Sequence, residues 1–300
     1  MTLTRFRSLK PLYKAMIFII LSAFCFALMN MFVHLAGELP APQKSFFRNF
    51  VAFIIAACAM AKDKVSPKLE KQAVLPILLR SFFGTIGILC NFYALDRLDL
   101  ADASILNKMS PFFVIVFSII ILKEKITMPQ LLMVLGALVG AMFVVKPSFA
   151  NTSAAPAFIA LFGGMCAGFA YTMVRLLGKK GVKGVLIVAF FSAFSCLFTL
   201  PFLIFDYHHM TYTQIIILML AGLSAAGGQF TITAAYQNAP ARDVSVYDYT
   251  QIIFAASLGF FVFGQIPDFL SWIGYFIIVL MAVLMFFYNK KKAAAEDQSA

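Results

Sequence analysis

Residues 131–145 read LLMVLGALVGAMFVV, a continuous apolar run without a charged side chain. A second run of this kind, YFIIVLMAVLMFF, occupies residues 275–287. Lipid leaves only α-helices and closed β-barrels as spanning structures, because every backbone polar group must be paired internally. Barrel strands alternate between apolar and polar residues over segments of about ten residues. The continuous runs therefore predict transmembrane helices.

The composition extends this prediction to the whole chain of 300 residues. Hydrophobic residues make up 62% of it and charged residues 12%, which is more apolar surface than a soluble domain could cover with polar groups. A spanning helix needs about 20 mostly apolar residues. We predict an all-α membrane protein with ten transmembrane helices, placed at about residues 14–35, 43–60, 74–95, 102–122, 128–145, 156–177, 184–205, 213–236, 243–264 and 269–288.

The lysine and arginine residues divide unequally between the two sides of this arrangement. With both termini on one side, eighteen fall in the segments of that side, whereas three, Lys44, Arg97 and Lys146, fall on the other. Basic loop residues are retained in the cytoplasm, so we expect both termini there, in the cytoplasmic membrane of a bacterium. The net charge of +11 then reflects topology and contact with membrane lipids. Nucleic acid is not an expected partner, because no tail or loop is long enough for a binding module.

An ungapped offset of 141 residues superimposes the two halves of the chain. It aligns two D-x-S motifs and several glycines, such as Gly87 with Gly228. Each half holds five predicted helices, and an odd number makes the second half enter the membrane from the opposite face. We therefore predict two inverted five-helix repeats, residues 14–145 and 156–288, joined by the loop at 146–157. Inverted repeats of this kind are a common construction of secondary transporters.

Lys108, in the stretch ILNKMSPFF at residues 105–113, is an ionisable residue deep in a predicted span. It lies roughly 6 Å from the middle of that span, at a rise of about 1.5 Å per residue. Such residues usually face a wet cavity and a partner, although snorkelling to the surface is the alternative. The repeat offset superimposes Asn107 and Lys108 on Asp248 and Tyr249. We predict that Lys108 and Asp248 face each other across a central substrate-binding cavity, with Asn107 beside them.

The pair has three roles that the sequence leaves open. Lys108 and Asp248 could bind a zwitterion, form a gating ion pair, or let Asp248 carry a proton. Pro111 removes a backbone hydrogen bond and is expected to kink the helix. The kink would either turn a free carbonyl toward the cavity or serve packing alone.

Two arginines also fall within predicted spans. Arg48, in KSFFRNF, is expected to line the cavity, because a guanidinium fork suits carboxylate or phosphate groups; contact with a lipid phosphate is the alternative. Arg80, in LLRSFFG, lies nearer the cytoplasm and is expected to anchor its helix at the interface.

Four uncharged polar residues complete the predicted site. Asn30 superimposes on Tyr171 under the repeat offset, and each would either line the substrate path or make an ordinary interhelical hydrogen bond. Tyr247 and Tyr249 flank Asp248, so they cannot both share its helical face. One is expected in the cavity and the other in packing or lipid.

The sequence offers little for catalysis or metal binding. Neither H-E-x-x-H nor G-x-S-x-G occurs, and the five cysteines and three histidines lack the spacing of ligand sets. Glu124 lies beside Lys123 and Lys125, where a solvated salt-bridge cluster is expected. We therefore expect neither a cofactor, a metal site nor an enzyme.

Several stretches of the chain resemble the EamA-domain branch of the drug/metabolite transporter superfamily. The resemblance covers about residues 14–288 as two EamA-like units, and it implies ten helices, cytoplasmic termini and a central cavity that moves small organic solutes by alternating access. Gln265 departs from the family, which often has an acidic residue there. The stretches that carry the resemblance are YALDRLDLADASILNKMSPFFVIVFSIIILKEKIT at 93–127, AYQNAPARDVSVYDYTQIIFAASLGFFVFGQIPD at 235–268, SFFRNF at 45–50 and LLRSFFG at 78–84.

These observations predict a secondary active transporter, an exporter or exchanger of a small polar or zwitterionic metabolite. Lys108 would hold an anionic group, Asp248 a cationic group or a coupling proton, and Arg48 would form part of the outer route. A passive channel is the first alternative, and an intramembrane enzyme is the second. The oligomeric state is left open.

Overall fold

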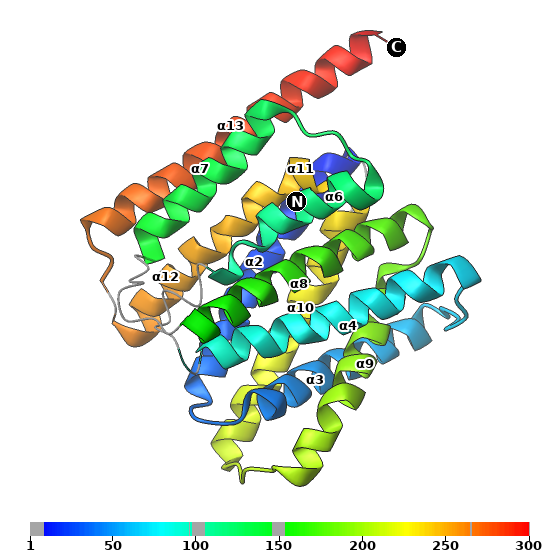
Figure 1. Cartoon of the computed structure of the whole chain (residues 1–300), viewed down its shortest axis with the longest axis vertical. Coiled ribbons are helices and arrows are strands. Elements are labelled where there is room, and N and C mark those ends of the chain that lie inside the picture. Colours follow the sequence, from blue (N-terminus) through cyan, green and yellow to red (C-terminus); the bar gives the residue numbers. More distant parts are fainter. Residues whose placement is uncertain (1–8, 96, 98–105, 146–153, 265, 300) are drawn as a thin grey trace.

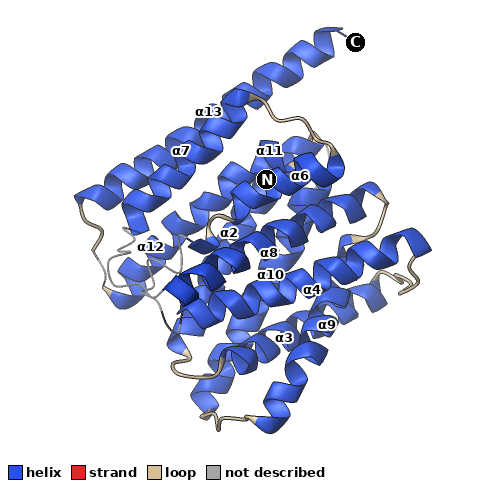
Figure 2. Ribbon diagram, in the orientation of Figure 1, coloured by secondary structure: helices blue, strands red, loops and turns tan. Residues whose placement is uncertain are grey.

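The computed structural model describes residues 9–95, 97, 106–145, 154–264 and 266–299. Every regular element in these ranges is helical (Figure 2). The elements are α2 (Pro11–Leu35), α3 (Ala41–Lys62), α4 (Lys71–Leu95), α6 (Ser110–Leu122), α7 (Met128–Val145), α8 (Ala154–Lys179), α9 (Gly184–Phe205), α10 (Tyr212–Asn238), α11 (Ala241–Val244), the 3₁₀ helix η2 (Ser245–Tyr249), α12 (Thr250–Phe263) and α13 (Phe269–Ser299).

The helices have the length and composition of membrane spans. Within the described ranges, 8 helical segments are long and apolar enough to cross a bilayer, and α6 and α7 are shorter apolar helices. Large apolar side chains such as Leu75, Ile120 and Phe276 are more than half exposed on the outside of the bundle, where lipid would cover them. The protein is therefore a multi-pass membrane protein.

The fourth predicted span differs from the structure. The prediction was one helix over 102–122, but α6 begins only at Ser110, and residues 98–105 lie outside the described part of the chain. Leu106 and Asn107 are helical, and Lys108 and Met109 form a turn. Pro111 falls in the first turn of α6, where its missing N–H costs no helical hydrogen bond. It therefore helps to begin a helix and does not kink one that continues.

The ninth predicted span is also irregular. It was expected as one helix over 243–264, but α11, η2 and α12 follow one another there, with Asp248 inside the 3₁₀ segment. A 3₁₀ stretch inside a longer helix is wound more tightly and often marks a functional position. Lys108 and Asp248 thus both lie where the regular α-helix is interrupted.

Pairs of helices that are distant in the sequence pack side by side (Figure 1). α2 packs along α10, α4 along α8, and α3 along α9, while α7 and α13 run together at one edge of the bundle. α6 lies against α8, and α12 lies against α2. Segments from both halves of the chain therefore surround the centre of the bundle.

Glycines allow the helix α8 to approach the interrupted segment closely. A Cβ at Gly164 would lie 2.8 Å from the carbonyl oxygen of Leu106, and one at Gly168 would lie 2.6 Å from the Cβ of Phe113. These contacts position the turn that carries Lys108. The two glycines stand four residues apart in GMCAG, a small-residue spacing that permits close helix contact.

Gly168→Val is expected to lower the free energy of unfolding by about 1–3 kcal/mol, because added side-chain atoms would overpack this contact. Thermal unfolding of the purified protein in detergent measures the effect. Leu75→Val, on the lipid-facing surface, is the control and should change the midpoint little. Equal midpoints for the two variants would contradict the packing role.

Candidate functional site

A cavity of about 100 Å³ lies at the centre of the bundle. A buried water needs roughly 10–15 Å³ of such space and a few polar partners, so the cavity has room for several waters. Its walls come from α2, α3, α4, α8, α9, α10, η2 and α12 and from the turn before α6. Its polar lining residues are Asn30, Arg48, Arg80, Asn91, Asn107, Lys108, Ser110, Tyr171, Gln229, Asp248 and Gln251.

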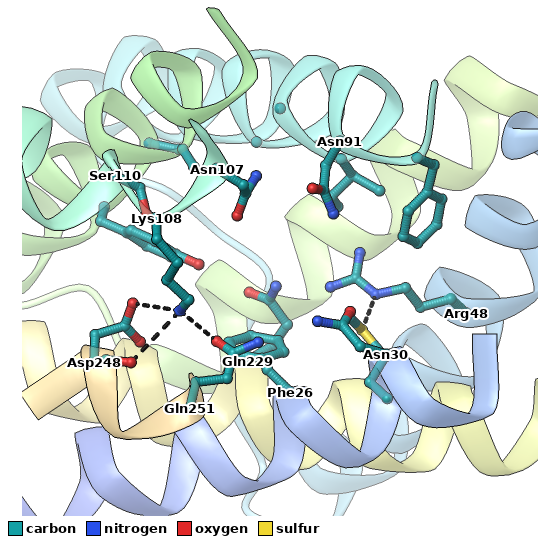
Figure 3. Close-up of a pocket in the computed structure, with 18 of the residues that line it drawn as sticks. Phe26, Asn30, Arg48, Asn91, Asn107, Lys108, Ser110, Gln229, Asp248 and Gln251 are labelled. Atoms are coloured by element: carbon teal, nitrogen blue, oxygen red, sulfur yellow. Dashed lines mark hydrogen bonds and ion pairs between the residues drawn. The ribbon is translucent and has the colours of Figure 1, made fainter. Parts of the chain in front are cut away.

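Lys108 and Asp248 form an ion pair at one end of this cavity (Figure 3). The Nζ atom of Lys108 donates to Oδ2 of Asp248 at 3.0 Å and to Oε1 of Gln251 at 2.6 Å. Both charged residues are buried, with 8% and 6% of their surface exposed. Each charge offsets much of the cost of desolvating the other. The two side chains therefore meet, as the repeat offset predicted.

Arg48 lies at the other end of the cavity (Figure 3). Its side chain projects from α3 and is 3% exposed. The Nε atom donates to the sulfur of Met29 at 2.9 Å, a weak acceptor. The Nη1 atom is buried and has no hydrogen-bond partner among the described residues. Arg48 therefore lines the cavity as expected, and its Nη1 donor has no acceptor in the described structure.

Arg80 is the clearest error of the prediction. It was expected at the membrane interface, but it is 1% exposed and lines the cavity. Its Nη2 atom donates to Oε1 of Gln229 at 2.8 Å, and its guanidinium carbon lies 4.1 Å from the ring centroid of Phe191. Because α4 already begins at Lys71, Arg80 lies roughly 13 Å along the helix and faces α9 and α10 instead of the lipid headgroups.

The predicted uncharged residues divide into two groups. Asn30, Asn107 and Tyr171 line the cavity, and the ring of Tyr171 stacks on Tyr236 with 5.3 Å between the centroids. Oδ1 of Asn30 is buried without a hydrogen-bond partner in the described structure.

Tyr247 and Tyr249 lie elsewhere. They are buried, at 5% and 0% exposure, in the hydrophobic core, and neither belongs to the cavity lining. The expectation that one of them faces the cavity is wrong for this structure. Of these three consecutive residues, Asp248 alone lines the cavity.

Sequence reasoning missed three amides of the lining, Asn91, Gln229 and Gln251. For Gln251 two signals were available: it follows Asp248 by three residues, and the offset of 141 superimposes it on Ser110, which also lines the cavity. Gln229 and Asn91 have apolar counterparts in the other half, so the offset does not reveal them.

A second polar cluster joins α6, α8 and α10. Glu124 accepts from Nε of Arg175 at 3.2 Å and from Nζ of Lys179 at 2.9 Å. Nη1 of Arg175 also donates to the carbonyl of Gln237 at 3.0 Å. The side chain of Glu124 is only 10% exposed. The expected cluster with its neighbours Lys123 and Lys125 is therefore corrected, because the ion-pair partners of Glu124 in the described structure lie on α8.

Hydrogen bonds join α7, α11 and α13 near the loop that connects α6 to α7. Nε2 of Gln130 donates to Oδ1 of Asp243 at 2.7 Å and to Oδ1 of Asn289 at 3.2 Å. Arg242 donates to the backbone carbonyl of Lys125. Together with the Glu124 cluster, these contacts hold the ends of six helical segments together; we call both groups the inner cluster. The grouping follows from the chain path, since residues 123–127 connect α6 to α7.

Comparison with known proteins decides the family of this chain. The family model described as the EamA-like transporter family matches residues 13–146 and 155–287. The chain belongs to the EamA-like transporter family. The pseudopaline exporter CntI of Pseudomonas aeruginosa is 32% identical over 261 residues, which cover 86% of this chain and 91% of that protein. A riboflavin transporter of Vibrio cholerae is 25% identical over 279 residues, covering 89% and 91%.

Two further similarities extend the EamA-like relationship. Human solute carrier family 35 member G1 is 25% identical over 277 residues, covering 83% of this chain and 72% of that protein. A solved crystal structure superimposes with a TM-score of 0.80 at 15% identity over 92% of this chain and 98% of that one, which shows the fold. The named relatives are transporters, and together with the family they point to membrane transport of a small molecule, not to an enzyme.

Proposed function

We propose that this EamA-like protein is a secondary active transporter that exports or exchanges a small polar or zwitterionic metabolite by alternating access. The observation that carries the proposal is the buried ion pair of Lys108 and Asp248 in the wall of a polar cavity. Lys108 holds an anionic group of the substrate, and Asp248 holds a cationic group or a proton. The name of the Pseudomonas aeruginosa relative, an exporter, supports outward transport.

The proposal includes ten spans in two inverted repeats, residues 14–145 and 156–288. Each main packing pair is converted into another main pair, or into itself, when corresponding helices of the two halves are exchanged. The exchange is α2 with α8, α3 with α9, α4 with α10, α6 with α12 and α7 with α13. The pair α2–α10 becomes α8–α4, and α6–α8 becomes α12–α2, while α3–α9 and α7–α13 map onto themselves. A two-fold relation between the halves explains this pattern, and it is the symmetry that rocking transporters use.

The direction of the chain supports a cytoplasmic location for the inner cluster. Arg175 and Lys179 end α8, and the following loop adds Lys180 and Lys183. Basic residues of short loops are retained in the cytoplasm, so this side faces inward, together with both termini, in a bacterial cytoplasmic membrane. The inner cluster would then close the inner end of the substrate path and would have to open for release or loading on that side.

Trans-stimulation distinguishes this carrier from the passive channel. Proteoliposomes are loaded with a defined mixture of amino acids, dicarboxylates and nucleosides, and mass spectrometry follows efflux of each solute. For a carrier with an alternating site, the same solute on the far side accelerates efflux, because the loaded site returns faster than the empty one. Protein-free liposomes are the control. Efflux that is insensitive to solute on the far side would favour a channel, and efflux of no solute would contradict the proposed function.

A further inference from the structure

The cavity carries an excess of positive charge. Three cationic side chains, Arg48, Arg80 and Lys108, and one carboxylate, Asp248, are the charged residues among its described lining. All four are at least nine-tenths buried. With the carboxylate ionised, the net charge of the lining is +2. Cationic groups in a low-dielectric interior are costly unless an anion accompanies them.

The two ends of the cavity differ in how this charge is balanced (Figure 3). At one end the ammonium of Lys108 has the carboxylate of Asp248. At the other end the guanidinium of Arg48 contacts a thioether sulfur. The guanidinium of Arg80, which also lines the cavity, contacts an amide and a phenyl ring. Neither arginine has a carboxylate partner in the described part of the chain. Nη1 of Arg48 and Nε of Arg80 are buried without any hydrogen-bond acceptor there.

Buried guanidinium donors without an acceptor have the chemistry to bind an acid. The planar fork of arginine matches the two oxygens of a carboxylate or phosphate group. The amides of Asn30, Asn91 and Gln229 lie between or beside the two ends (Figure 3), where they can bind neutral polar parts of the same molecule. One ligand in this cavity can therefore contact both the arginines and the ion pair.

We propose that the substrate is an amino acid-like metabolite with at least two acidic groups and a net charge of about −1 to −2. One acid binds the forks of Arg48 and Arg80. A second acid forms an ion pair with Lys108 in place of Asp248. The amine of the substrate forms an ion pair with Asp248 in place of Lys108. Without substrate, Lys108 and Asp248 thus neutralise each other, as the carboxylate and the ammonium of the substrate do when it is bound. This proposal rests on the proposed transport function and narrows its substrate class.

Paired probes that differ only in the second acid test the proposal. The thermal midpoint of the purified protein is measured with glutamate against glutamine, and with iminodiacetate against sarcosine, at equal millimolar concentration and ionic strength. A ligand that binds the folded protein raises its midpoint. The member with two acids is expected to bind about tenfold or more tightly than its partner, because an arginine fork bound to an acid is a charge-assisted contact. O-phosphoserine is a third probe, and a larger shift than with glutamate would identify the second acid as a phosphate.

Variants at the arginines locate the second acid. Arg48→Gln and Arg80→Gln are expected to remove the difference between glutamate and glutamine and to leave the response to glutamine. Arg48→Lys and Arg80→Lys keep the charge without the fork and should retain part of the difference, which guards against variants that fail to fold. Lys68→Met, in an exposed inner loop, is the matched control.

The outcomes separate this inference from the proposed function. Equal midpoints for the two members of each pair, or no shift with any probe, would overturn the diacid proposal. Trans-stimulated efflux of monoacids or neutral solutes alone would also overturn it, although the transport function would stand. Absence of trans-stimulated efflux for every solute would instead remove the transport function.

Discussion

Lys108→Met is expected to reduce transport by about 100-fold or more. It leaves the carboxylate of Asp248 buried without its ammonium partner, which costs about 3–5 kcal/mol when one member of a buried pair is removed. It also removes the contact for the anionic group of the substrate. Asp248→Asn should have a similar effect through the loss of the opposite charge. Solute exchange in proteoliposomes measures the loss, with thermal unfolding of each variant beside it.

The double variant Lys108→Met/Asp248→Asn separates folding from function. With both charges removed, no unpaired charge is buried, so the thermal midpoint should recover toward that of the unmodified protein. Solute exchange should nevertheless stay low. Lys68→Met, exposed and far from the cavity lining, should leave both properties unchanged. Normal exchange in both single variants would remove Lys108 and Asp248 from the transport site.

Glu124→Gln is expected to shift the protein toward the form that is open to the cytoplasm. The substitution removes the ion pairs with Arg175 and Lys179, which would stabilise only the form with a closed inner end. Ser118→Cys supplies a reporter, because Ser118 is 2% exposed and lines a small cavity with Glu124. A membrane-impermeant thiol reagent added from the cytoplasmic side should label it about tenfold faster in the Glu124→Gln background. That factor corresponds to about 1.4 kcal/mol, less than the cost of breaking a fully buried pair.

The matched control for this experiment is Glu70→Gln, which changes an exposed acidic residue of the loop between α3 and α4. Labelling of the reporter should then match that of the unmodified background. A reporter that reacts equally fast with and without Glu124 would show that the inner cluster does not govern access from that side.

The helical membrane architecture could be predicted because it depends on local composition. Runs such as 131–145 and 275–287 are apolar over roughly two thirds of the hydrocarbon thickness, and lipid permits few other structures for them. The meeting of Lys108 and Asp248 could also be predicted, since the offset of 141 residues relates the two halves before any contact is known. The same offset could also have predicted that Gln251 lines the cavity.

The orientation of Arg80 lies beyond such reasoning. α4 is apolar on nearly every face, so its sequence has no amphipathic pattern that tells the cavity side from the lipid side. Its arginine is buried because Gln229 and Phe191, from helices more than 100 residues later, supply its contacts. The ion-pair partners of Glu124 could not be predicted either. Lys123 and Lys125 are its neighbours in the sequence, but the fold of α8 brings Arg175 and Lys179 into contact with it.

The amino-acid sequence was thus sufficient for the helical class, the family and the pairing of two opposite charges. The class and the pairing follow from hydrophobicity and from an internal duplication, which can both be read along the chain, whereas the family follows from the resemblance of particular stretches. The turn at Lys108, the 3₁₀ winding at Asp248 and the two arginines with unused donors needed the folded molecule. They depend on which helices approach closely, as Gly164 and Gly168 permit beside Lys108, and close packing between distant segments leaves no local signal.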